Sequence, residues 1–195
     1  MIRRRKAGRL SSGPMFSSLR FRWYASDIGD LAFLAVGVFF VLVLGGIAGF
    51  AYVDHAHRRA AEQRRADLEC LAENVFFEAR GEPLVGQYAV AEVTMNRVAS
   101  PLFPDSVCEV VHERHWDSKR KRYVGAFSWT ELDSLGRPGG YEWRRAQAVA
   151  STIYENSREA PLADGALFYH ATRISPDWAR SKTRVARIGR HLFYE

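Results

Sequence analysis

The chain has 195 residues, 47% of them hydrophobic, which is enough for one domain with its own core and an appendage. Its formal net charge is +6, but residues 1–53 hold seven Lys/Arg and two acids, whereas residues 54–195 hold 21 bases and 20 acids. The basic character therefore belongs to the N-terminal segment, and the nearly neutral remainder argues against a nucleic-acid-binding protein.

The most apolar stretch is residues 31–53, LAFLAVGVFFVLVLGGIAGFAYV, which contains no charged residue. Because about 20 such residues span a bilayer as a helix, we predict a transmembrane helix over 31–53 behind a basic cytoplasmic tail, residues 1–30. A buried core helix and a cleavable signal peptide, whose apolar region is usually about 7–15 residues, are the alternatives. More bases precede the segment than closely follow it, which predicts a single-pass inner-membrane protein with a cytoplasmic N-terminus and a periplasmic domain.

The polar residues 54–66 favour a helix and are predicted to form a stalk, and residues 67–195 are predicted to form the globular domain. Residues 113–140 look irregular, and their basic run at 119–122 is predicted to be a solvated loop, with binding of an anionic polymer as the alternative. Apolar spacing and capping residues predict further helices over 85–99, 106–112 (capped by Asp105) and 141–158, and small strands over 166–171 and 184–195. The predicted fold class is mainly α with a small β element (α+β).

The first helix of this domain is predicted over 68–80, with Asp67 as its N-cap and Gly81 as a left-handed residue at its C-terminal end. Glu78 then lies in the last helical turn, whereas Glu82 lies in the loop beyond it. Apolar surroundings and the negative end of the helix dipole would both raise the pKa of Glu78, as a general acid requires. A solvated surface glutamate is the alternative.

The two cysteines, Cys70 and Cys108, both fall in the segment predicted to be exported. An even pair in an oxidising compartment favours a disulfide, and two buried free thiols are the alternative.

Several motifs in this order resemble the SleB-type cell wall hydrolases, the spore cortex-lytic enzyme family. They are NVFFEARGEPLVGQYAVAEVTMNRV, FPDSVCEVV, FSW, ALFYHA and IGRHLFY, and they span roughly residues 68–194. The resemblance implies a lysozyme-like, resuscitation-factor-like catalytic domain that cleaves the glycan backbone of peptidoglycan. It also implies that the first glutamate of E-A-R-G-E, Glu78, is the catalytic acid. The chain departs from the family pattern at Ala126, where glutamine is common, and at Arg190, where a smaller polar residue is common.

A glycosidase that activates water usually needs two carboxylates, but only Glu78 is well marked. We therefore expect a one-acid mechanism, lytic transglycosylation between N-acetylmuramic acid (MurNAc) and N-acetylglucosamine (GlcNAc). Candidate second carboxylates are Glu82, Asp105, Glu131, Asp133 and Asp177. Candidate substrate-binding residues are Glu82, Ser128, Trp129, Tyr169, His170 and Trp178, with core packing as the alternative for each tryptophan and a turn hydrogen bond for Ser128.

The chain contains neither an H-E-x-x-H motif nor a Cys/His zinc pattern, so no metal and no cofactor are predicted, and His191 is expected to be structural. An N-acetylmuramoyl-L-alanine amidase and a non-catalytic peptidoglycan-binding or divisome scaffold remain as alternative functions. The expected partners are peptidoglycan and the membrane, with envelope or divisome proteins as candidates and no nucleic acid.

Overall fold

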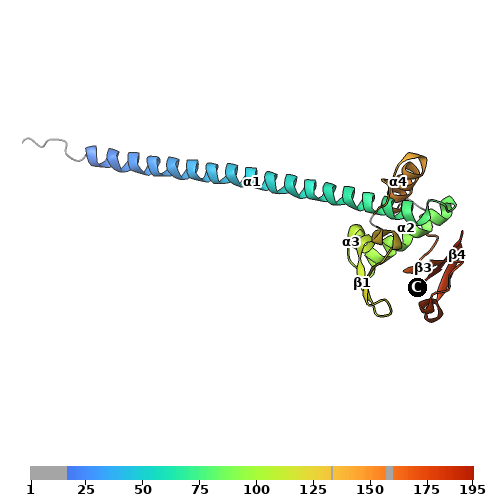
Figure 1. Cartoon of the computed structure of the whole chain (residues 1–195). Helices are drawn as coiled ribbons and strands as arrows, with labels where there is room; N and C mark the ends of the chain where they lie inside the picture. Colours follow the sequence, from blue (N-terminus) through green and yellow to red (C-terminus); the bar gives the residue numbers. More distant parts are fainter. Residues whose placement is uncertain (1–16, 133, 157–159) are drawn as a thin grey trace, which may run out of the picture. The chain divides into compact units, whose positions relative to one another are not determined.

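The computed structural model describes residues 17–132, 134–156 and 160–195, with side chains from Ile28 onward (Figure 1). The chain divides into two compact units, residues 1–58 and residues 59–195. Helix α1 (Ser17–Ala79) contributes to both units. Residues 1–16 of the predicted tail lie outside the described residues.

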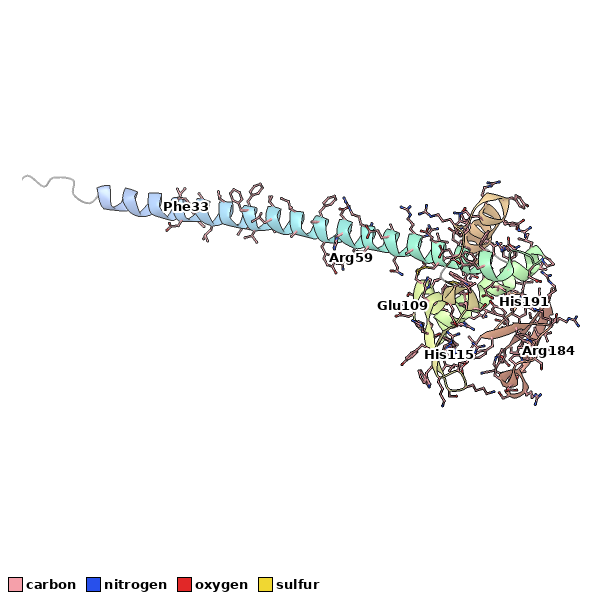
Figure 2. All side chains as sticks on the ribbon, in the orientation of Figure 1. Phe33, Arg59, Glu109, His115, Arg184 and His191 are labelled. Atoms are coloured by element: carbon pink, nitrogen blue, oxygen red, sulfur yellow. A yellow bond between two sulfur atoms is a disulfide. The ribbon has the colours of Figure 1, made fainter. Side chains whose placement is uncertain are left out.

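The first unit contains the apolar part of α1. Among the described residues, one helix is long and apolar enough to cross a membrane by length and composition, and its most apolar window has a mean hydropathy of 2.7. None of that window is buried, and Phe33, for example, is 80% exposed (Figure 2). An exposed apolar helix of this length suggests a membrane anchor or a signal sequence, since both have an apolar segment near the N-terminus.

The second unit is mainly helical. Its principal core cluster joins the end of α1 to α2 (Leu84–Ala99), α3 (Val107–His112) and α4 (Gly140–Tyr154). The cluster is aliphatic at its centre, with Leu71, Val75, Val107, Val111 and Val149 all at most 1% exposed. Burying five such side chains contributes roughly 1.5–3 kcal/mol each before the entropy cost of folding, so this cluster holds the helices together.

The prediction that a new helix begins at Asp67 is wrong, because α1 continues through this residue. Residues 54–66 contain neither glycine nor proline, so nothing in the stalk ends the helix. Asp67 is 6% exposed, and its carboxylate accepts hydrogen bonds from Gln63 (3.1 Å) and from the Tyr154 hydroxyl (3.4 Å). Its role is to tie α1 to the end of α4.

Three other helix ends differ from those predicted from the sequence. Gly81 does not adopt a positive φ; instead α1 ends at Ala79, and the Glu82 amide closes a turn onto the Ala79 carbonyl at 2.9 Å. Ser106, not Asp105, caps α3, since its side chain accepts from the Glu109 amide. Helix α4 ends earlier than predicted, because Asn156 just beyond it has φ 49°. Residues 157–158 of that predicted helix lie outside the described part of the chain.

Two antiparallel sheets complete the unit. Strands β3 (Phe168–Ala171), β4 (Arg184–Ile188) and β5 (His191–Tyr194) form a sheet in the order β3-β5-β4. Strands β1 (Arg114–Asp117) and β2 (Arg122–Gly125) form a hairpin, where the sequence predicted irregular structure. In Figure 2 the labelled His115 marks the hairpin and His191 marks the terminal sheet. The hairpin was missed because its turn lacks the usual Asn-Gly signature; Lys121 occupies the left-handed position instead, with φ 54°.

The basic run at 119–122 forms the turn of this hairpin and the start of β2. Three of its four cations pair with carboxylates, so the run does not present four free positive charges. The pairs are Lys119–Asp177, Arg120–Asp117 and Arg122–Glu131, with N···O distances of 2.6, 3.6 and 2.7 Å. These pairs disfavour the alternative that the run binds an anionic polymer.

A disulfide joins Cys70 on α1 to Cys108 on α3, so the two helices are covalently linked across 38 residues of sequence.

Candidate active site

A cleft of about 600 Å³ lies in the second unit, where the end of α1 meets the terminal sheet. Two short 3-10 helices, η1 (Ser128–Glu131) and η2 (Asp177–Ser181), form other parts of its wall. All the residues predicted to bind or act on substrate line this cleft: Glu78, Glu82, Ser128, Trp129, Tyr169, His170 and Trp178. They come from three parts of the sequence that are far apart, residues 78–82, 128–129 and 169–178, which the fold brings to one place.

Glu78 lies in the last turn of α1, and its side chain is half-buried at the cleft. Burial raises the pKa of this carboxyl above its ordinary value, although a hydrogen bond from Tyr169 and the charge of Arg97 oppose the rise. The Tyr169 hydroxyl donates to Glu78 Oε2 at 3.3 Å. Glu78 is therefore a carboxyl group that holds its proton more tightly than a solvated glutamate does.

Tyr169 occupies the second position of β3, opposite Phe193 of β5. Its ring lies 5.7 Å from the Phe193 ring and meets the His191 ring edge-on at 5.3 Å. Burial, followed by the nearby charge of Glu78, raises the pKa of Tyr169 well above its ordinary value. The phenol thus stays protonated, and it can donate to the Glu78 carboxyl across the physiological pH range.

Arg97, which is not among the predicted site residues, is the cation whose charge acts on Glu78 and Tyr169. It is 8% exposed in the last turn of α2, and its Nε donates to the Leu167 carbonyl at 2.8 Å. Its guanidinium lies 5.1–6.0 Å from the centres of the Phe103, Phe127 and Phe168 rings. The charge is thus fixed in an aromatic cage, from which it stabilises the ionised form of Glu78.

Asn74, also missed, positions one wall of the cleft. It lies one helical turn before Glu78 and is fully buried. Its side-chain oxygen accepts from Trp129 Nε1 at 2.9 Å, while its side-chain nitrogen donates to Thr94 Oγ1 at 3.1 Å. Trp129 also stacks on Phe77 with ring centres 4.7 Å apart. Trp129 belongs to the core cluster and also lines the cleft, so its predicted contact with substrate stays a prediction.

Glu82 has a different environment from Glu78. Its side chain is 4% exposed, and its two oxygens accept from the Arg190 amide (2.8 Å) and the Arg190 Nε (2.7 Å). Burial by itself would raise the pKa of Glu82, but these hydrogen bonds and the charge of Arg190 bring it below its ordinary value. Glu82 is thus an ionised group that fastens the β4–β5 turn to the end of α1, which makes it unsuitable as a proton donor.

Arg190 and Gly189 explain the I-G-R-H segment in physical terms. Arg190 departs from the residue expected there, and its guanidinium also donates to the Gly81 carbonyl at 2.7 Å. Gly189 has φ 55°, and a Cβ at this position would lie 2.3 Å from Glu82 Oε2. Only glycine leaves room for the Glu82 carboxylate in this turn.

Two histidines border the cleft. His170 Nδ1 lies 3.0 Å from the Ala171 carbonyl, which can only accept, so Nδ1 carries the proton and Nε2 accepts from the Tyr194 hydroxyl at 3.0 Å. Burial lowers the pKa of His191, which therefore stays neutral at physiological pH. His191 begins β5 and also lines the cleft, beside Glu82.

The remaining predicted residues differ in exposure. Ser128 is exposed at the start of η1, and Trp178 is 36% exposed on η2 with its ring 5.6 Å from that of His170. Of the other candidate second carboxylates, Glu131 and Asp177 are engaged by Arg122 and Lys119 and do not line the cleft. Asp105 is also absent from its wall, and Asp133 lies outside the described residues. Among the residues that the structure describes, no group of three or more His, Cys, Asp or Glu could hold a metal ion.

The sequence model of the Cell Wall Hydrolase family matches residues 81–194, more than half of the chain, and the chain belongs to this family. The match contains every predicted substrate-binding residue but begins three residues after Glu78. The case for Glu78 as the acid therefore depends on its geometry in the cleft and on the motif that contains it.

Curated relatives are spore cortex-lytic enzymes. That of Bacillus subtilis is 35% identical over 131 residues, covering 66% of this chain and 37% of the relative. That of Halalkalibacterium halodurans is 32% identical over 127 residues, covering 65% of this chain and 34% of the relative. The chain therefore spans just over a third of the length of these two relatives.

A solved structure, the catalytic domain of the germination-specific lytic transglycosylase SleB from Bacillus anthracis, is similar to this chain with a TM-score of 0.51 and 27% identity. The similarity covers 66% of this chain and 93% of that domain. The chain is thus a homologue of this lytic transglycosylase and has its mainly helical fold with small antiparallel sheets.

Proposed function

We propose that this protein is a membrane-anchored lytic transglycosylase that cleaves the MurNAc–GlcNAc linkage of peptidoglycan, with Glu78 as its single acid and base. The observation that carries the proposal is the pair of contrasting carboxylates in the cleft. Among the described residues that line it, Glu78 and Glu82 are the only acids. The pKa of Glu78 is raised, mainly by burial, whereas that of Glu82 is lowered by its bonds to Arg190 despite burial.

This contrast favours transglycosylation over hydrolysis. A hydrolase that uses two carboxylates needs a second one that is free to activate water or to attack the sugar. Both oxygens of Glu82 are engaged by Arg190, so Glu82 does not supply that group. One carboxyl group can suffice if the nucleophile is a hydroxyl of the sugar itself.

The mechanism then has two proton transfers through the same residue. Protonated Glu78 donates its proton to the bridging oxygen as the bond from muramoyl C1 to that oxygen breaks, and GlcNAc leaves with a free hydroxyl. The resulting carboxylate takes the proton of the muramoyl 6-hydroxyl as its oxygen bonds to C1. The product is a 1,6-anhydromuramoyl end, and Glu78 is protonated again. The Tyr169 hydroxyl, at 3.3 Å, stabilises the carboxylate between these two steps.

The fold and the N-terminal segment support the rest of the proposal. We infer a lysozyme-like arrangement of acid and groove, with the apolar part of α1 as a single-pass anchor in the inner membrane and the catalytic unit in the periplasm. The disulfide between Cys70 and Cys108 fits an oxidising compartment. Envelope or divisome proteins are candidate partners at that location.

The test is digestion of purified sacculi by the full chain in detergent, with mass analysis of the soluble products. Fragments with 1,6-anhydromuramoyl ends are expected. Reducing ends would replace transglycosylation by hydrolysis, and free stem peptides would make the protein an amidase. Glu78→Gln is the matched control, and the absence of products from the folded wild-type protein would leave the non-catalytic scaffold.

A further inference from the structure

A second hollow, of about 470 Å³, adjoins the catalytic cleft. Tyr169 and Trp178 line both spaces, so the two hollows lie on either side of this pair. Because the Tyr169 hydroxyl contacts Glu78, a group in the second hollow would lie next to the sugar on which Glu78 acts. The second hollow is therefore placed to hold a part of the same substrate.

The wall of the second hollow contains the aromatic rings of Phe103, Phe168, Tyr169 and Trp178, together with charged residues that include one acid, Glu113. The Phe168 ring lies 6.2 Å from the Phe103 ring and 5.8 Å from the Trp178 ring. Ala126, which replaces the longer residue expected before the F-S-W motif, also lines it. A methyl side chain at this position leaves space that a larger one would fill.

The hollow also presents one cation that is not engaged by an acid. Lys182 Nζ lies 3.9 Å from the centre of the Phe168 ring, and no ion pair joins it to a carboxylate among the residues that the structure describes. Arg97, by contrast, is bonded to the Leu167 carbonyl, and its charge is partly balanced by Glu113 and Glu78. Lys182 is therefore the group available to an anionic ligand, and the exposed His115 also lines the hollow.

We propose that this hollow binds the acidic peptide stem on the muramoyl residue that Glu78 attacks. The proposal rests on the proposed function and specifies its substrate as peptide-bearing glycan. Stem peptides combine small apolar side chains with free carboxylates. Their methyl groups would pack on Phe168 and Trp178, while a carboxylate would meet Lys182 in a partly desolvated site, where such pairs are stronger than in water.

Binding to the Glu78→Gln full chain in detergent tests this without turnover. Calorimetry would compare a GlcNAc–MurNAc disaccharide that carries a tetrapeptide with the same disaccharide without it. One charge-assisted hydrogen bond is worth about 1.5 kcal/mol, so we expect the peptide-bearing ligand to bind roughly tenfold more tightly. Equal affinity for the two ligands would overturn the proposal. So would a longer glycan without peptide that binds tenfold more tightly than the bare disaccharide.

Variants assign the effect to the hollow. Lys182→Met keeps the apolar stem on Phe168 but removes the charge, so it should abolish the tenfold preference, and Lys182→Arg should restore most of it. Lys121→Met removes a charge from the hairpin turn, outside the hollow, and should leave the preference intact. A preference that survives Lys182→Met, or that disappears equally with Lys121→Met, would contradict the assignment.

A second variant tests the space itself. Ala126→Gln adds four non-hydrogen atoms to the wall and should reduce the preference without changing any charge. Failure of the proposed function is seen separately, because it would appear as the absence of anhydro products from sacculi, whereas this binding difference does not require turnover.

Discussion

Replacement of Gly189 by alanine tests the contact between the terminal sheet and the end of α1. Gly189 has φ 55°, a conformation that costs an alanine about 1–2 kcal/mol. The new Cβ would also lie 2.3 Å from Glu82 Oε2, so the carboxylate must move away from the Arg190 amide and Nε. Loss of one hydrogen bond to a charged group adds about 1.5–3 kcal/mol. We expect Gly189→Ala to lower the free energy of unfolding by roughly 2.5–5 kcal/mol.

Urea unfolding followed by tryptophan fluorescence measures this change, because Trp129 is 9% exposed in the folded core. The matched control is Gly136→Ala, since a Cβ at Gly136 meets nothing within 4 Å and its φ is not positive. The control should change stability by less than about 0.5 kcal/mol. If Gly189→Ala and Gly136→Ala unfold at the same urea concentration, the close approach of Glu82 to this turn does not exist.

Three further predictions concern the candidate active site and the Cys70–Cys108 disulfide. Glu78→Gln should abolish anhydro-product formation without lowering stability. Because the pKa of Glu78 is raised, wild-type activity should fall as the pH rises through that pKa. The free energy of unfolding of the wild type should fall relative to that of the variant over the same pH range. If wild-type activity falls only on the acid side of its pH profile, or if Glu78→Gln still turns over substrate, another residue is the acid. Asn74→Ala leaves the Trp129 indole without its acceptor, so it should cost about 1–3 kcal/mol and weaken glycan binding in calorimetry, and unchanged binding would contradict its positioning role. Reduction of the Cys70–Cys108 disulfide should cost up to about 4 kcal/mol by loss of the loop constraint, and thiol alkylation of unreduced protein should label neither cysteine.

The sequence was most informative where a pattern is local. Helical spacing located α2 to within a residue, and glycine and proline near Glu82 correctly placed it beyond the end of α1, with Glu78 in the last turn. The prediction that Asp67 caps a new helix was wrong. A capping residue marks the start of a helix only where the preceding segment is not itself helical. The prediction of mainly helical structure with a small β element is confirmed in its coarse form.

The roles of individual site residues were harder to predict, since their partners are distant in the sequence. Asn74 reads as one polar residue in an apolar helix until Trp129, 55 residues later, is placed against it. Glu82 reads as a loop residue until Arg190, 108 residues later, binds both its oxygens. For the Asn74–Trp129 contact, the only local signal was the position of Asn74 one turn before a candidate acid. For the Glu82–Arg190 contact, the sequence contains no local signal.

The contact between Glu82 and the β4–β5 turn also bears on when the cleft can form. Part of its wall comes from the end of α1, part from residues 128–135, and part from residues 169–191. A chain that has been synthesised or exported only as far as α4 contains Glu78 but lacks Tyr169, Arg190 and the rest of that last part of the wall. Its acid would lack the Tyr169 hydroxyl and this part of the cleft wall. The complete cleft should therefore form only after residues 169–191 have been synthesised.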